Sequence, residues 1–177
     1  AKWNLARFAE CLVPLINKDK DSGIQIATKI VNDFSQKYKK EWFGMMRRKL
    51  GLFGNDINDE KLIMDLLAWM HKNKADYTNT FCFLMNQNYI KGEIYKDENF
   101  LNWKKKWRER LRMNNSSIEE SLKSMYTSNP LVIPRNHKVE EALEAANNND
   151  LNPLKKLLRV LEKPYEFQKD IEGYQSP

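Results

Sequence analysis

The residues best suited to hold a charged group lie in a loop expected between two helices. Residues 129–137 read Asn-Pro-Leu-Val-Ile-Pro-Arg-Asn-His, so two prolines stiffen the backbone before three consecutive polar side chains. Arg135 is suited to hold a carboxylate through two parallel hydrogen bonds, and Asn136 is suited to cap the following helix. Together with His137 these residues are candidates for binding or for a structural lock between helices, and we favour the lock.

No other residues have the spacing of a catalytic, nucleotide-binding or metal site. The six glycines include no Gly-x-Gly pair, and Gly51 and Gly54 lack the Lys and Ser/Thr of a phosphate-binding loop. His71 is expected near a helix end, where a partial positive charge is favourable. Asp56 and Asp59 lack the alternating ligands and the closing Glu of a calcium loop. We therefore expect neither a catalytic residue nor a metal site in this chain.

Six cations are interleaved with Trp103 and Trp107 along residues 103–112, which is the composition of a nucleic-acid-binding patch. The helical register argues against that role, because Trp103 and Trp107 share one apolar stripe with Phe100 and Leu111. We expect both indoles to lie in the core. We expect the cations to lie on the surface, and they are Lys104, Lys105, Lys106, Arg108, Arg110 and Arg112. A stand-alone helical interaction module that binds RNA through residues 103–112 remains the alternative function, although nucleic acid is not the partner we favour.

The composition is that of a folded domain in a reducing compartment. With 177 residues, of which 41% are hydrophobic, the chain can bury a core, and its formal net charge is +6. Cys11 and Cys82 lie in apolar helical contexts, so we expect two buried thiols and a cytoplasmic location. No apolar run approaches the roughly 18 residues of a membrane span, so we expect no membrane partner.

Apolar side chains recur every three to four residues along almost the whole chain, which is typical of amphipathic helices. This pattern predicts an all-α fold of about eight helices in an irregular bundle. It predicts a single helical domain at residues 1–164 and an extended tail at residues 165–177. The expected helix caps are Asn4, Asp76, Ser116 with Glu119, and Asn152. Because the chain enters a helix at once and lacks an initiator Met, we expect it to be a piece of a longer polypeptide.

The loop residues also carry a family resemblance. Residues 133–142, Ile-Pro-Arg-Asn-His-Lys-Val-Glu-Glu-Ala, resemble a signature of the selenoprotein O family, the protein adenylyltransferases with a kinase-like, or pseudokinase, fold. Further matches occur in the same order along the chain, namely Trp3-Asn4-Leu5-Ala6-Arg7, Lys49-Leu50-Gly51-Leu52, Asp76-Tyr77-Thr78-Asn79 with Phe81, and Pro164-Tyr165. The resemblance thus covers nearly the whole chain. One departure is Cys82, where the family often places Arg.

The resemblance implies a function for the full-length protein rather than for this chain alone. Members of the family transfer AMP from ATP to Ser, Thr or Tyr hydroxyl groups of proteins, a reaction called AMPylation, with a divalent metal such as Mg²⁺. Their nucleotide- and metal-binding residues precede the counterpart of Trp3. The chain would therefore be the C-terminal helical region, without catalytic residues. Its partners would be the N-terminal kinase-like region of the same polypeptide and, in the full-length protein, the substrate proteins.

Overall fold

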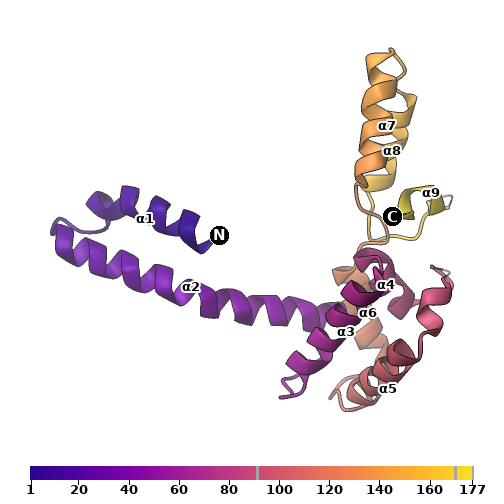
Figure 1. The fold of residues 1–177 in the computed structure, drawn as a ribbon, viewed down its shortest axis with the longest axis horizontal. Coiled ribbons are helices and arrows are strands. Elements are labelled where there is room, and N and C mark those ends of the chain that lie inside the picture. The colour runs from indigo at the N-terminus through magenta and orange to yellow at the C-terminus, as the bar shows by residue number, and fades with distance from the viewer. Residues whose placement is uncertain (91, 170, 177) are drawn as a thin grey trace. The chain divides into compact units, whose positions relative to one another are not determined.

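The computed structural model describes residues 1–90, 92–169 and 171–176, and this part of the chain is all-α, as predicted. It contains nine α-helices, one 3₁₀ helix and no strand (Figure 1). The bounds are α1 Lys2–Ile16, α2 Lys20–Lys49, α3 Asp59–Asn73, α4 Tyr77–Met85, η1 Glu93–Lys96, α5 Glu98–Arg112, α6 Ile118–Ser128, α7 Asn136–Asn147, α8 Asn152–Leu161 and α9 Glu172–Gln175.

The chain packs as two compact units. The sequence pattern alone predicts one helical domain over residues 1–164. The units are Ala1–Met45 and Met46–Pro177, and α2 belongs partly to each. Helical periodicity marks an apolar face on each helix but does not say which faces pack together, so it does not specify such a division.

The first unit is a hairpin of α1 and the N-terminal part of α2, joined by a short turn (Figure 1). The side-chain oxygen of Asn17 accepts the N–H of Asp19 at 2.9 Å, and the carboxylate of Asp19 accepts the N–H of Ser22 at 2.9 Å. Beside the turn, a Cβ on Gly23 would lie 3.1 Å from the carbonyl oxygen of Val13. A glycine at this position therefore lets the two helices approach closely where the hairpin closes.

The first unit differs from the sequence-based expectations in two places. Helix α1 already begins at Lys2, so Asn4 lies inside its first turn and does not cap it. Cys11 is exposed rather than buried, and its thiol donates to the carbonyl oxygen of Arg7 at 3.4 Å. Pro14 lies inside α1, which ends two residues later at Ile16.

The core of the second unit lies around α3 and α5, which pack against each other. Their aromatic rings join those of α4 and η1, with ring centroids 4.5 Å apart for Trp69 and Phe100 and 4.1 Å apart for Phe83 and Tyr95. Each such ring pair stabilises the fold by roughly 0.5–1.5 kcal/mol, in addition to the hydrophobic contribution of burying the rings. Fully buried aliphatic and aromatic side chains from α2, the turn after it, α3, α4 and α6 complete this core, among them Met46, Leu50, Ile63, Leu66, Phe81 and Met125.

Helix caps in the second unit lie at or next to the predicted residues. Asp76 caps α4, as predicted, since its carboxylate accepts the N–H of Asn79 at 2.8 Å. The predicted capping box of Ser116 and Glu119 is one residue out of register, because Ser117 and Glu120 form it instead. Consecutive serines and consecutive glutamates offer the same spacing twice, so local pattern cannot choose between them. Asn152 is likewise the first residue of α8 rather than its cap, which is Leu151.

Helices α7 and α8 form a second hairpin, and the chain then folds back beneath it (Figure 1). Asn149 adopts a left-handed conformation, with φ 65°, where the connection turns. The predicted extended tail contains the short helix α9, and the side chains of Ile171 and Gln175 are buried. The tail is therefore packed within the second unit, where the side-chain amide of Gln175 donates to the distant carbonyl oxygen of Leu131.

Candidate functional site

The loop of residues 129–135, singled out by its two prolines, is held on both sides by other parts of the second unit. Asn129 is buried, and its amide donates to the carbonyl oxygens of Lys49 and Met125 at 2.9 Å each. Farther along, the Leu131 N–H donates to the carbonyl oxygen of Pro164 at 2.7 Å, and the Leu131 carbonyl accepts the amide of Gln175 at 2.9 Å. The loop thus connects α2, α6 and the C-terminal segment.

Arg135 holds a carboxylate with two parallel hydrogen bonds, as its sequence context predicts. Its two terminal nitrogens donate to the two oxygens of Asp76 at 2.6 and 2.9 Å. One of these nitrogens also donates to the carbonyl oxygen of Gln175 at 3.1 Å, and the amide of Asn79 donates to the same carbonyl at 2.9 Å. We call these four residues the Arg135 clamp. The clamp joins the start of α4, the start of α7 and α9.

The clamp is largely shielded from water. The side chains of Arg135 and Asp76 are 12% and 17% exposed. Burial raises the pKa of Asp76, but hydrogen bonds from Arg135 and from the N–H groups of Asn79 and Thr78 outweigh burial and hold the pKa below its ordinary value. The carboxylate therefore stays charged near neutral pH and remains paired with the guanidinium. Nε of Arg135 is buried and has no hydrogen-bond partner among the described residues.

The structure separates Arg135 from the two polar residues that follow it. Asn136 and His137 are exposed, in the first turn of α7. The expected capping role of Asn136 is wrong, because α7 begins at Asn136 itself and its N-terminal cap, Arg135, makes no side-chain cap hydrogen bond. The three candidates therefore do not form one site, and only Arg135 belongs to the clamp.

A buried thiol and a buried ammonium lie behind the loop. Cys82 is fully buried, as predicted, with its sulfur 3.4 Å from the carbonyl oxygen of Pro130. Burial raises the pKa of the Cys82 thiol to about 12, so it is protonated and unreactive near neutral pH. The ammonium of Lys49 donates to the carbonyl oxygen of Ser128 at 3.2 Å and lies 4.7 Å from the ring centroid of Phe81. Burial lowers the pKa of Lys49.

These groups connect helices through hydrogen bonds and an ion pair. Each oxygen of the Asp76 carboxylate faces a guanidinium nitrogen, and the thiol of Cys82 faces a carbonyl group. Among the described residues no three His, Cys, Asp or Glu side chains lie close enough to bind a metal ion together. A structural lock, one of the two roles that the sequence leaves open for Arg135, would use contacts of this kind.

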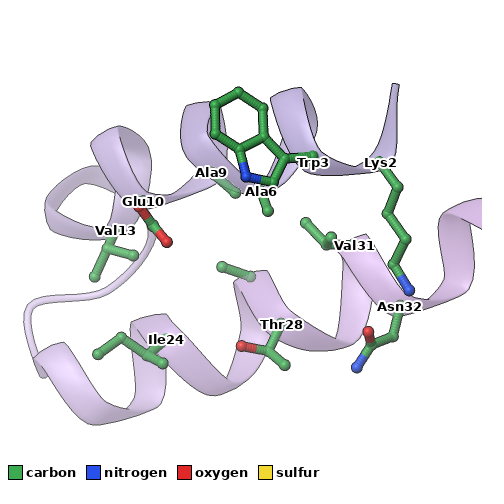
Figure 2. Close-up of a pocket in the computed structure, with 11 residues that line it drawn as sticks. Lys2, Trp3, Ala6, Ala9, Glu10, Val13, Ile24, Thr28, Val31 and Asn32 are labelled. Atoms are coloured by element: carbon green, nitrogen blue, oxygen red, sulfur yellow. The ribbon is translucent and has the colours of Figure 1, made fainter.

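The first unit contains a groove of another kind, about 500 Å³ in volume, between α1 and α2. Figure 2 shows its lining, in which Ala6 of α1 points toward Val31 of α2. Trp3 of α1 and Thr28 of α2 also line the groove. Lys2, Glu10 and Asn32 add polar groups along the lining. Trp3 is 71% exposed, so its indole adds exposed aromatic surface to the groove.

Comparison with known proteins assigns the family. The family model described as "Protein adenylyltransferase SelO" matches residues 1–162. The chain belongs to the SelO family. It is 52% identical over 164 residues to the protein nucleotidyltransferase YdiU of Pelagibacter ubique (strain HTCC1062), covering 93% of this chain and 34% of that protein. It is 45% identical over 177 residues to the YdiU protein of Alcanivorax borkumensis, covering 99% of this chain and 37% of that protein.

The SelO-family chain spans about a third of the length of these curated relatives. None of the helices that the structure describes is long and apolar enough to cross a membrane.

The tryptophans of this SelO chain lie in the core, as the helical register predicts. Trp103 and Trp107 are 5% and 4% exposed, and their indole N–H groups donate to the carbonyl oxygens of Leu62 and Leu50 at 2.8 and 2.9 Å. Lys104 was expected on the surface but is buried, with its ammonium 4.8 Å from the ring centroid of Phe83. Stacking of RNA bases on these indoles would require the core to open.

The structure also contains a second buried ion-pair network, which the sequence did not predict. The carboxylate of Asp59 is fully buried and accepts hydrogen bonds from Arg47 at 3.0 Å and from Arg110 at 2.7 Å. Arg110, counted from sequence among the surface cations, also donates to the carbonyl oxygen of Phe53 at 2.9 Å. Both arginines look like ordinary surface cations in the sequence, so no local signal identifies them.

Proposed function

We propose that this chain is the C-terminal helical region of a SelO-family protein adenylyltransferase. The full-length protein would transfer AMP from ATP to Ser, Thr or Tyr hydroxyl groups of proteins. The hydroxyl oxygen would attack the α-phosphorus, and pyrophosphate would leave. The observation that carries this proposal is the family match over residues 1–162. The YdiU relatives, which are named protein nucleotidyltransferases, support transfer of a nucleotide.

We assign ATP and Mg²⁺ to the kinase-like region of the same polypeptide. The loops at Gly51 and Gly54 do not resemble a phosphate-binding site, since they lack a neighbouring lysine with Ser or Thr. We place the protein in the cytoplasm, in keeping with two free thiols, of which Cys11 is exposed.

The role that we propose for this region is mechanical support of the kinase-like core and, through it, of substrate docking. The Arg135 clamp ties α4 to the start of α7 and to α9, so it fixes the α7–α8 hairpin to the rest of the second unit. Such an arrangement is stiff, because two charge-assisted bonds share one planar guanidinium. A stiff support can hold a protein substrate without contributing a catalytic group.

The test uses the full-length protein with ATP and Mg²⁺, labelled in parallel at the α- or the γ-phosphate. AMP transfer predicts that α-label enters protein and γ-label does not. Incorporation of γ-label alone would show phosphoryl transfer and refute the proposal. Arg135→Ala should reduce transfer only as far as it unfolds the protein. Unchanged melting with lost transfer would instead place Arg135 at the substrate.

We do not propose RNA binding, because Trp103 and Trp107 are engaged in the core. RNA binding to exposed lysines alone should disappear as salt rises, since its affinity comes from released counterions. A titration of single-stranded RNA with tryptophan fluorescence would test this. Binding that survives physiological salt and quenches the fluorescence would restore the RNA-binding alternative.

A further inference from the structure

The hairpin of the first unit leaves most of its apolar surface uncovered. Phe8 of α1 is 62% exposed, and Ile30 of α2 is 58% exposed. Helix α3 has the same length as α1 but buries Leu62, Ile63, Leu66, Trp69 and Met70, whereas Val13 is the one buried residue in α1. Apolar surface of this extent is unusual on a free-standing protein and marks a contact surface.

The uncovered surface forms two grooves rather than one. The first, shown in Figure 2 and called here the Trp3 groove, has a volume of about 500 Å³. The second, called here the Phe8 groove, has a volume of about 330 Å³. Its lining is almost wholly apolar and consists of Leu5, Phe8, Ala9, Leu12, Ile16, Ala27, Ile30, Val31, Phe34 and Lys37. Ala9, Ala27 and Val31 line both grooves, so the grooves flank the seam between α1 and α2.

We propose that the rest of the same polypeptide covers both grooves, so that the hairpin is enclosed on its two sides. The rest of the polypeptide is the part of the relatives' length that this chain does not span, about two thirds, since the chain covers 34% and 37% of two of them. The inference rests on the proposed function, in which this region supports a kinase-like core, and it names the surface that does so.

Two physical reasons favour the same polypeptide over a second copy or a transient partner. A two-helix unit of 45 residues has too little interior to be stable by itself, so its cover must be present whenever the protein is folded. A partner that dissociates would expose Trp3, Phe8 and Ile30 to water each time it left. A covalently attached cover avoids this, because its effective concentration does not depend on the protein concentration.

Hydroxyl-radical footprinting of the native full-length protein tests the inference without any substitution. Modification of Trp3 and Phe8 is compared with modification of the same residues in urea. Trp103, which is 5% exposed, and Ile57, which is 94% exposed, serve as the protected and the open reference. We expect Trp3 and Phe8 to be protected as strongly as Trp103. Modification of either at its rate in urea, as expected for Ile57, would overturn the inference.

A matched pair of substitutions provides a second measurement. Ile30 lines the Phe8 groove, whereas the neighbouring Lys29 is exposed and lines neither groove. In the full-length protein, Ile30→Asp should raise the equilibrium constant of unfolding by on the order of 100-fold, because it places an unpaired charge in an apolar contact. Lys29→Asp should change it little. Equal effects of the two substitutions in denaturant titrations would contradict a covered Phe8 groove.

Dilution of the protein distinguishes a cover provided by a second copy, and an assay of AMP transfer separates this inference from the proposed function. Protection of Trp3 and Phe8 that is lost on dilution, together with conversion of dimer to monomer in light scattering, would assign the cover to a second copy and overturn the inference. Neither footprinting nor unfolding depends on AMP transfer. Protected grooves in a protein that transfers no AMP would therefore refute the proposed function while supporting the covered hairpin.

Discussion

Replacing Arg135 with alanine should destabilise the second unit by about 2–3 kcal/mol. Removing one member of a buried ion pair costs roughly 3–5 kcal/mol, whereas an exposed pair contributes less than about 1 kcal/mol. With side chains 12% and 17% exposed, the pair of Arg135 and Asp76 lies nearer the buried limit. Two features reduce the expected loss of stability. Asp76 keeps the hydrogen bond that it accepts from the N–H of Asn79, and the unpaired Nε is removed together with the arginine.

The assay is unfolding of the chain by heat and by urea, followed by circular dichroism. A loss of 2–3 kcal/mol corresponds to a fall in melting temperature of about 4–12 °C for a chain of this size. A double-mutant cycle with Asp76→Asn, which retains a capping side chain, should give a coupling energy of about 1–2 kcal/mol. Arg135→Lys should lose part of the stability, because an ammonium cannot make the two parallel bonds.

Lys138→Ala is the matched control for this substitution. It breaks the pair of Lys138 and Glu141, whose side chains are 26% and 57% exposed, and should cost no more than about 0.5 kcal/mol. If Arg135→Ala is as mild as Lys138→Ala, the clamp does not hold the fold together and the structural reasoning fails.

Three further predictions concern backbone strain, acid and nucleotide. Gly51→Ala should lower the stability to urea more than Gly54→Ala does. Both glycines have a positive φ, 67° and 74°, so both substitutions strain the backbone. In addition, a Cβ on Gly51 would lie 2.9 Å from the Ser121 carbonyl oxygen, whereas a Cβ on Gly54 would meet nothing within 4 Å. The pKa of Asp76 lies below its ordinary 3.8, so the stability that its charged form contributes should be present above about pH 3.8 and lost as the pH falls below it. Between about pH 6 and about pH 3, the urea midpoint should therefore fall less steeply in Arg135→Ala than in the unsubstituted chain. Calorimetry of the chain with ATP and Mg²⁺ should show no saturable binding, and a micromolar isotherm would place a nucleotide site in this region.

The amino-acid sequence determined the features that depend on near neighbours along the chain. The 3.6-residue period placed Trp103 and Trp107 in the core, and the cap at Asp76 follows from the residue type just before an apolar run. Residues 129–137 stood out because of their prolines, and Arg135 implied a carboxylate partner. These inferences succeeded because helix capping and amphipathicity are set within one or two turns.

Only the tertiary structure decided which groups meet across the chain. The carboxylate that Arg135 holds lies 59 residues away, and Asp59 pairs with Arg110 from 51 residues away. Burial of Lys104 over an aromatic ring and exposure of Cys11 were both missed. A side chain's type and its position in the helical period do not specify its partner, because the partner depends on which helix faces it. That choice belongs to the packing of whole helices.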